Sequence, residues 1–498
     1  MPAIITNKFR IHNQEQFVES FTETAANVYY LGIGRPQAFA TSTRGDLRTE
    51  NEGTDAAPLT PVDSIGDEFY TFDDMLAAKK VTSSDVSICV PRRNWATATV
   101  YDYYRHDYGN RITGTTNTQA ANSGATNLYD ATFYVVSSTY NVYKCLDNNS
   151  NANSTVEPTG TSTSILSTGD GYKWKYLYSL TASQQTNFLS TDFMGVATDS
   201  TVSAAAVDGA LEIVKVKTAG SSYDVSGGAT TGTITAVPIR GDGSGGVCSV
   251  VLASGAVSTV TVTTAGTGYT FAYIRNADII AATNAGGNGS GAELDVIIPP
   301  KGGHGFNAVK EVGGFYVMMN VNFEGVETGS GSDVSAANDF RKIALVRDPK
   351  SAGSAASATT LRATKAVRFA SSPTPGTFAI DEEINQATTG AVGKVVEWDS
   401  VNRILYYIQT RFNDEGVDSN GNLTGFSAGN VITGQGGTSP TGTPDTTESS
   451  TVNGTTFASG YSVSELDADD GDIIYLENRA PITRATDQTE NIKLIVEF

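Results

Sequence analysis

Short runs of apolar residues alternate along most of the chain with stretches rich in Gly, Ser, Thr and Asn. Near the start, Phe17, Val18 and Phe21 follow the spacing of one helical face, which predicts a helix over 11–27. The continuous apolar run over 28–34 predicts a buried strand. β-Branched and aromatic residues set between many turn formers favour short strands over long helices. The expected fold class is therefore mainly β, with a few short helices.

The same pattern places several further elements. Asn13 would cap the first helix, and the apolar positions over 72–80 predict a second, short helix. The remaining runs predict a hairpin followed by three single strands, over 133–136, 140–146, 172–180, 473–476 and 492–498.

From residue 211 the composition shifts, and a sequence pattern repeats after 46 residues. Each copy contains a strand, an Ala-Gly turn, a tyrosine, a glycine-rich turn and a second strand. The matching residues of the first part are Val214, Val216, Thr218, Ala219, Gly220 and Tyr223 in one copy, and Val260, Val262, Thr264, Ala265, Gly266 and Tyr269 in the other. Two copies are too few for a solenoid, so we expect a compact, two-lobed β module over 211–299.

A second segment rich in Gly and Thr extends over 361–460. Within it, the stretch from Phe378 to Ile384 is echoed weakly by the stretch from Phe426 to Ile432. Both stretches precede Gly- and Thr-rich tracts, which indicate turns and loops. We expect a second β module here.

The chain has 498 residues and is acidic, with 33 basic and 53 acidic side chains and a net charge of −20. An acidic surface repels phosphate groups, which argues against nucleic acid or an anionic membrane as a partner. The three cysteines, Cys89, Cys145 and Cys248, suit folding in a reducing cytoplasm and do not make a disulfide framework. We find neither a signal-peptide pattern nor an apolar stretch of membrane-spanning length.

The motifs that carry chemistry are weak. The glycine-rich stretches 241–246 and 287–292 match a dinucleotide fingerprint, but β-prone residues follow each, where that fingerprint needs a helix. The three histidines lie in no metal-ligand spacing, and the aspartates of 467–472 are typical of a solvated turn. We therefore expect no catalytic residue, no cofactor and no metal ion.

The corner Pro91-Arg92-Arg93-Asn94-Trp95 stands out in an acidic chain. Adjacent arginines beside a tryptophan can form an internal corner held by ion pairs. The same residues also dominate interface hot spots. Both interpretations stay open, so Arg92, Arg93 and Trp95 are candidate structural or interface anchors.

Several segments, taken in order, resemble one known family. The segments are 3–10, 90–95, 101–104, 142–147, 169–177, 474–482 and 487–490, with a terminal Phe498. They resemble the eighth-gene baseplate wedge proteins of T-even-type contractile-tailed bacteriophages. The resemblance covers roughly 1–195, parts of 306–349 and 465–498. Tyr475, Asn478, Arg479 and Pro481 lie in its C-terminal motif, and we take them as further candidate anchors.

The resemblance implies a β-sandwich core that assembles as a homodimer in each baseplate wedge of the virion tail. It implies contacts with the wedge-backbone proteins and with the subunit that carries the fibres and spike, and it implies no enzymatic activity. The subunit would be made and assembled in the host cytoplasm, and would take part in the baseplate rearrangement that triggers sheath contraction. Nucleic acid and membrane are not expected partners.

The repeat and the Gly/Thr-rich segment are absent from the family type, so they look like insertions. The predicted organisation is a wedge core over 1–210, 300–360 and 461–498, interrupted by inserted modules over 211–299 and 361–460. The inserted modules also motivate an alternative, a host-binding tail adhesin or fibre-type protein. A carbohydrate-active tail enzyme is a third alternative, but it needs a carboxylate pair in an aromatic cleft, and the sequence places none.

Overall fold

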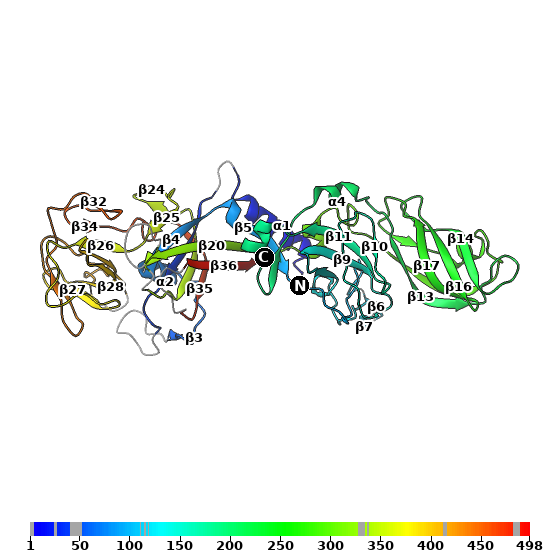
Figure 1. Cartoon of the computed structure of the whole chain (residues 1–498), viewed down its shortest axis with the longest axis horizontal. Coiled ribbons are helices and arrows are strands. Elements are labelled where there is room, and N and C mark those ends of the chain that lie inside the picture. The colour runs from blue at the N-terminus through cyan, green and yellow to red at the C-terminus, as the bar shows by residue number, and fades with distance from the viewer. Residues whose placement is uncertain are drawn as a thin grey trace. The chain divides into compact units, whose positions relative to one another are not determined.

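The computed structural model describes residues 4–23, 27–39, 52–109, 111–113, 116–117, 119–326, 334–335, 338–411, 416–481 and 489–498. The chain divides into two compact units. Unit 1 comprises Met1–Gln16, Ser87–Met318 and Ile495–Phe498, and unit 2 comprises Phe17–Val86 and Met319–Leu494. Both units are built mainly from antiparallel sheets with a few short helices (Figure 1). This confirms the predicted mainly β fold class.

A four-stranded sheet forms the first part of unit 1, in the order β10-β11-β9-β8. Its strands are β8 (Tyr134–Val136), β9 (Asn141–Asp147), β10 (Leu166–Ser167) and β11 (Lys173–Ser179). β8 and β9 pair antiparallel, so the predicted hairpin is confirmed. Buried aromatic residues, including Phe133, Tyr134 and Tyr178, fill its core. Short helices accompany it, α3 (Ala182–Asn187), α4 (Ser200–Ala205) and α6 (Ala308–Val312).

The repeat region of unit 1 forms one module with a single core. All buried residues of this core lie between Leu211 and Ile298. The elements are β13 (Ile213–Ser221), β14 (Gly232–Pro238), β15 (Arg240–Gly241), β16 (Val247–Ala253), β17 (Ala256–Thr264), β18 (Ala272–Tyr273), α5 (Asn276–Ile280) and β19 (Ser290–Ile297). The expected two lobes are wrong, because the copies are interleaved: β13 of the first copy pairs with β19 of the second, and β16 pairs with β17.

Each of the two repeated tyrosines also binds the backbone of the other copy. The Tyr269 hydroxyl of the second copy accepts the Gly246 N–H of the first at 3.1 Å. The Tyr223 hydroxyl of the first copy accepts the equivalent N–H, that of Ala292, at 3.1 Å. A Cβ at Gly243 would lie 2.5 Å from the Tyr269 ring, so this glycine is required by the tyrosine of the other copy.

A five-stranded sheet in unit 2 has the order β25-β4-β1-β22-β35. Its strands are β1 (Tyr29–Gly34), β4 (Met75–Val81), β22 (Lys342–Arg347), β25 (Thr360–Arg362) and β35 (Asp472–Asn478). β1 is the strand predicted over 28–34. The short helix predicted over 72–80 is wrong, because α2 (Ile65–Asp74) precedes it and β4 occupies most of that range. β4 is a strand because it pairs with β1 on one side and β25 on the other.

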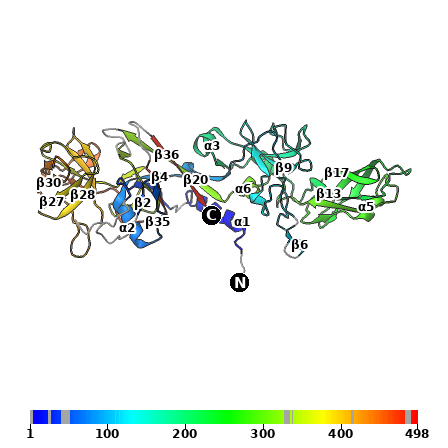
Figure 2. The same cartoon turned by 90° about the horizontal axis from the view of Figure 1, so that it is seen from below.

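A seven-stranded sheet in unit 2 has the order β31-β30-β27-β28-β29-β26-β34 (Figures 1 and 2). Its strands are β26 (Lys365–Arg368), β27 (Glu383–Gln386), β28 (Ala391–Asp399), β29 (Ile404–Ile408), β30 (Ile432–Gly434), β31 (Thr441–Gly442) and β34 (Tyr461–Ser462). The two echoing stretches end in β27 and β30, which pair with each other. The buried side chains of this sheet come from Val367 to Ile432 and form a core of their own.

The remaining elements lie around these sheets. Helix α1 (Asn7–Glu19) starts earlier than predicted, because the Thr6 hydroxyl and carbonyl accept the Phe9 N–H; Asn13 therefore lies inside the helix and does not cap it. The other strands are β2 (Gly53–Thr54), β3 (Ala57–Pro58), β5 (Val86–Pro91), β6 (Arg111–Thr113), β7 (Thr116–Asn117), β12 (Phe193–Gly195), β20 (Tyr316–Val326), β21 (Val334–Ser335), β23 (Lys350–Ser351), β24 (Ser354–Ala355), β32 (Thr451–Val452), β33 (Thr455–Thr456) and β36 (Thr489–Glu497).

Candidate assembly surface

β35 is the outer strand of the five-stranded sheet in the part of unit 2 that the structure describes. On its inner side it pairs antiparallel with β22, with Tyr475 opposite Leu345. On its other side no described strand pairs with it. The outward backbone groups of an outer strand can pair with a strand of another chain. β35 therefore has the backbone geometry of an assembly site.

A groove of about 290 Å³ lies along β35. One wall is β35 itself, from Ile473 to Leu476, and the other is the segment 61–68, which leads into α2. Two apolar side chains of this groove are exposed, Val62 at 63% and Ile474 at 42%. Ile65, which is 69% exposed, belongs to the same segment. We call this hollow the β35 groove. Its exposed apolar walls suit contact with a partner.

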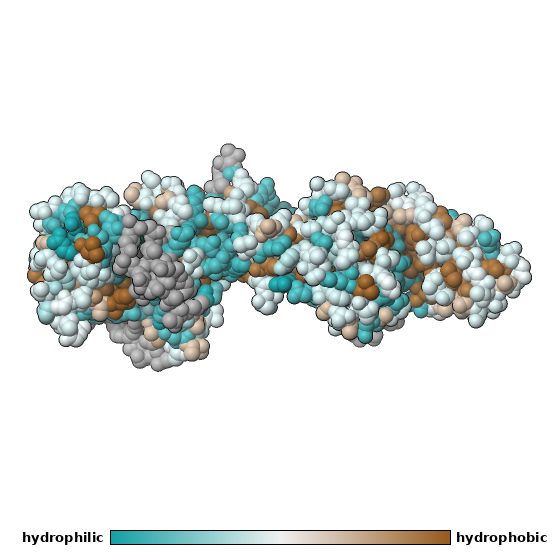
Figure 3. Space-filling model, in the orientation of Figure 1, coloured by the Kyte–Doolittle hydropathy of each residue, from teal (hydrophilic) through white to brown (hydrophobic). Residues whose placement is uncertain are grey.

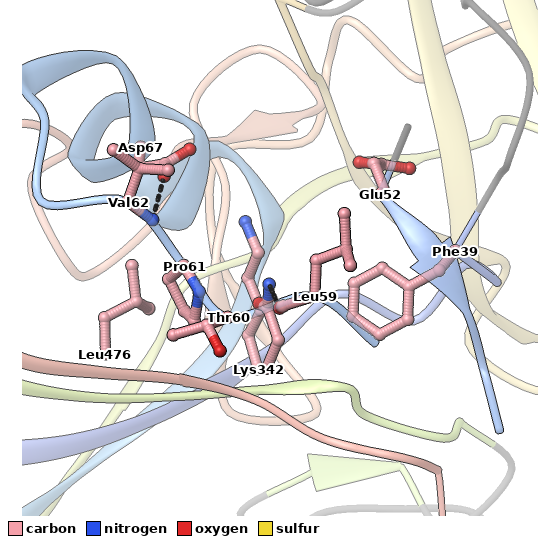
Figure 4. Close-up of a pocket in the computed structure, with 10 residues that line it drawn as sticks. Phe39, Glu52, Leu59, Thr60, Pro61, Val62, Asp67, Lys342 and Leu476 are labelled. Atoms are coloured by element: carbon pink, nitrogen blue, oxygen red, sulfur yellow. Dashed lines mark hydrogen bonds between the residues drawn. The ribbon is translucent and has the colours of Figure 1, made fainter. Parts of the chain in front are cut away.

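The 61–68 wall is held in a fixed conformation. The Ser64 hydroxyl accepts the Asp67 N–H at 3.2 Å and so caps α2. The Asp67 carboxylate accepts the Val62 N–H at 2.8 Å, as Figure 4 shows. At the other end of the helix, Asp73 binds Arg411 at 2.9 Å. Burial raises the pKa of Asp73 to about 6, although the Arg411 pairing opposes this shift.

A smaller pocket, of about 100 Å³, continues from the β35 groove and shares Pro61, Val62 and Leu476 with it. Figure 4 shows these residues on one side, and Leu59 and Phe39 on the other. The remaining lining residues include Glu52, Lys342 and Asn478. The Asn478 amide donates to the Leu59 carbonyl at 3.0 Å and so ties the strand to the opposite wall.

At the C-terminal end of β35, a third hollow of about 520 Å³ is lined by two basic side chains, one acidic side chain, Glu477, and several apolar ones. Arg479 and Lys493 supply its positive charge, and Pro481 and Ile492 supply apolar surface. The Arg479 guanidinium lies 5.7 Å from the centre of the Phe340 ring. The groove beside the first half of β35 is instead acidic, with Asp63, Asp67 and Glu68. The start of the strand is thus bordered by three acidic residues, and its end by two basic residues and Glu477.

The structure places the two sets of predicted anchors very differently. Tyr475 lines the β35 groove, Asn478 the smaller pocket, and Arg479 and Pro481 the basic hollow. The Tyr475 hydroxyl donates to Glu477 at 3.0 Å, and burial, with Glu477 nearby, raises its pKa to about 12.

Arg92, Arg93 and Trp95 point instead into unit 1. The Arg93 guanidinium donates to the carbonyls of Ala131 and Tyr129, the second at 3.2 Å, and lies 4.7 Å from the centre of the Tyr134 ring. The Trp95 indole N–H donates to the Ser154 hydroxyl at 3.1 Å. Of the two interpretations left open by the sequence, these contacts favour the internal corner, though one held by backbone carbonyls rather than ion pairs.

Arg92 completes the corner with two further hydrogen bonds. Its Nε donates to the Asn94 side chain and one Nη donates to the Ser190 carbonyl, both at 2.9 Å. All three anchors of this corner therefore have partners within their own unit.

The residues that sequence reasoning missed are three apolar side chains in and beside the 61–68 wall, Leu59, Val62 and Ile65. They recur every third residue, but Pro58 and Pro61 interrupt the run, so the spacing predicts neither a strand nor a helix. Figure 3 shows how such apolar patches are scattered over a mostly polar surface. Only the fold brings these residues next to β35.

The weak chemical motifs have structural roles. Strands β16 and β19 follow the two glycine-rich stretches, as expected. Asp469, Asp470 and Asp472 form ion pairs with Arg411, Lys350 and Arg347. Among the described residues, no three His, Cys, Asp or Glu side chains are grouped as a metal site requires. The three cysteines are buried and free, and no described helix has the length and apolarity to cross a membrane.

A family profile matches this chain at both ends. The match at the C-terminal end includes β35 and the C-terminal anchors. The family is described as "Phage-Gp8: Bacteriophage T4, Gp8", and the match covers residues 3–156 and 438–498. Over the matched residues, which are less than half of the chain, the sequence is similar to the Gp8 family. Gp8 proteins are structural proteins of the phage baseplate wedge. No curated protein matches the chain.

The Gp8 match bears on the predicted modules. Residues 157–437 lie outside it, and this stretch contains the whole repeat module over 211–299. The match includes 438–460, which the sequence pattern places within the second module. The predicted domain boundaries therefore stay predictions.

Proposed function

We propose that this chain is a non-enzymatic scaffold of the baseplate wedge that pairs with a second copy of itself along β35. The homodimer would present its remaining surfaces to the wedge-backbone proteins and to the subunit that carries the fibres and spike. The observation that carries the proposal is the outer strand β35, bordered by a groove with exposed apolar walls.

Symmetry supports a second copy as the occupant. When two identical outer strands pair antiparallel, the same patch lies on both sides of the interface and the assembly closes as a dimer. With the centre of such a pairing near Tyr475, the Ile474 side chain of each copy would lie close to the Val62 wall of the other. Apolar surface exposed in the monomer would then be buried.

Charge supports the same arrangement. Antiparallel pairing brings the start of one β35 next to the end of the other. The acidic residues Asp63 and Glu68 of one copy would then approach Arg479 and Lys493 of its partner. A single chain thus carries both halves of a complementary pair, and complementary charge favours correct association.

The mechanical part of the proposal concerns the rearrangement that triggers sheath contraction. Switching of this kind needs interfaces that repack between discrete states. A strand edge fixes the register of a dimer through its backbone, while the polar outer surface of the subunits can exchange contacts. Folding and assembly in the host cytoplasm agree with three free, buried cysteines.

Light scattering on the purified chain tests this proposal. We expect a mass of about 104 kDa, twice the chain mass of 52.2 kDa. The double variant Val62→Asp with Ile474→Asp should be a folded monomer, because dimerisation would bury two unpaired charges from each copy. The matched control is Val401→Asp with Val463→Asp, since these valines are 84% and 78% exposed in the same unit and lie outside the groove.

Two results would contradict the proposal. A monomeric parent chain would show that no second copy binds. A groove variant that dimerises as well as the control would show that the interface lies elsewhere. A trimer, at three times the chain mass, would favour the alternative of a host-binding adhesin.

A further inference from the structure

The two interleaved copies of the repeat module are alike in their strands but differ at one surface. Here the second copy places Phe271, Tyr273 and Arg275, and the first copy contributes Arg240. The positions related to these by the 46-residue offset hold Val225, Gly227, Ala229 and Gly286. The shared scaffold does not need the large residues, because small ones occupy the equivalent positions. We call Phe271, Tyr273, Arg240 and Arg275 the aromatic patch.

The two rings of the aromatic patch form an exposed platform. Phe271 is 55% exposed and Tyr273 is 45% exposed. Their ring centres are 6.2 Å apart and their planes differ by 10°. Tyr273 belongs to β18, where it pairs with Arg240 of β15. Exposing two large rings costs free energy in water, so an exposed parallel pair indicates contact with a ligand or partner.

The two arginines are held in place by one buried carboxylate. Asp278 of α5 accepts from the Nε and one Nη of Arg275 at 2.8 and 2.9 Å, and from the same two atoms of Arg240 at 3.3 and 2.8 Å. The Asp278 side chain is 7% exposed, whereas the arginine side chains are about half exposed. The pairing lowers the pKa of Asp278 and raises that of both arginines.

This arrangement leaves donors directed outward. Among the described residues, the second Nη of Arg240 and of Arg275 has no hydrogen-bond partner. The donors are fixed before any ligand arrives, and such preorganisation lowers the entropy cost of binding.

An exposed carboxylate lies at the border of the platform. Asp242 accepts the Thr270 N–H at 2.9 Å and the Phe271 N–H at 3.2 Å, and the Thr270 hydroxyl also donates to it. These bonds fix the turn that carries Phe271 and lower the pKa of Asp242 to about 2. The two arginines and the two aspartates balance in charge, so the surface favours an uncharged ligand.

We propose that the aromatic patch binds an uncharged saccharide, with the C–H face of a hexopyranose ring over Phe271 and Tyr273. Aromatic faces are negative and attract the weakly positive C–H groups of such a ring. Its hydroxyl groups would accept from Arg240 and Arg275 and donate to Asp242. A protein partner fits less well, because small or polar residues flank the rings (Gly241, Asp242 and Thr270) and a wider apolar surface is missing.

An oligosaccharide array tests this inference on the intact chain. The array should display neutral hexose chains beside uronate and phosphorylated chains. We expect retention by neutral chains that is insensitive to salt, because no net charge is neutralised. Phe271→Ala with Tyr273→Ala should weaken retention by about tenfold or more, which is 1.4 kcal/mol or more. Phe271→Tyr with Tyr273→Phe should retain binding, since both rings remain.

The matched control is Tyr140→Ala, because Tyr140 is a 37% exposed aromatic residue of the same unit outside the module. It should bind as the parent does. Thermal unfolding of each variant checks folding. The inference is overturned if no neutral chain is retained, if the Phe271 and Tyr273 variant binds like the parent, or if that variant instead loses a protein partner. None of these outcomes depends on pairing along β35.

Discussion

Two arginine-bearing segments look alike in the sequence and differ in the fold. Arg92 and Arg93 donate to backbone carbonyls of their own unit, and so hold a corner together. Arg479 lies over Phe340 and lines an open hollow at the end of an outer strand. The sequence assigns both to the same class of anchor, the first through its Arg-Arg-Asn-Trp composition and the second through the family motif. The difference lies in whether the donors find internal acceptors.

The first consequence is a large loss of stability at the corner. Arg93→Ala leaves the carbonyls of Ala131 and Tyr129 without their donor and removes the contact with the Tyr134 ring. We expect the free energy of unfolding to fall by about 2–3 kcal/mol, measured as a urea midpoint by tryptophan fluorescence. The mass of the assembly in solution should remain that of the parent dimer.

Arg92→Ala is the matched control for this variant. It removes one bond to a backbone carbonyl and should cost about 1 kcal/mol. An Arg93 variant that is as stable as the parent but no longer dimerises would show that the corner is an interface after all.

A smaller loss is expected at Trp95. Trp95→Phe retains an aromatic ring but removes the donor to the Ser154 hydroxyl. We expect about 1 kcal/mol less stability, by the same urea titration, and an unchanged mass. Ser154→Ala alone should cost more, because the Ser154 hydroxyl also donates to Asp170 at 3.2 Å. Adding Trp95→Phe to Ser154→Ala should then cost little more, since the bond that the two residues share is already lost.

How far the sequence predicts this structure depends on whether a feature is local. β1 and the β8–β9 hairpin were predicted because their apolar residues are continuous. β4 was missed because Met, Leu, Ala and Lys are good helix formers. Its position between β1 and β25 overrides that preference.

The module and the candidate site depend on contacts between distant segments. The 46-residue repeat reveals two similar copies but not that β13 pairs with β19. Likewise, the β35 groove joins 61–68 to 473–476, about 400 residues apart. Tyr475 and Arg479 were found through the family motif. Val62 and Ile65 carry no such signal, because their exposure is visible only in the fold.

The smallest effect on stability should occur at Arg479. Arg479→Ala removes one contact with Phe340 at 5.7 Å, so we expect the free energy of unfolding to change by less than about 1 kcal/mol. The dimer should dissociate about tenfold more readily, because the acidic groove of the partner loses its counter-charge. Sedimentation at several concentrations measures this. If Arg479→Ala instead lowers the stability of the monomer and leaves the dimer affinity unchanged, Arg479 is an internal anchor and not part of the interface.

Disulfide trapping across β35 tests the central claim most directly. Two antiparallel strands bring equivalent residues near their centre close enough for a disulfide, and the three natural cysteines are buried. Single variants Ile474→Cys, Tyr475→Cys and Leu476→Cys, oxidised mildly, should include one that gives a covalent dimer in high yield. Val401→Cys, which is exposed elsewhere in the unit, should not. If all three β35 variants remain monomeric on a non-reducing gel while the parent chain is a dimer in solution, the strand does not form the interface.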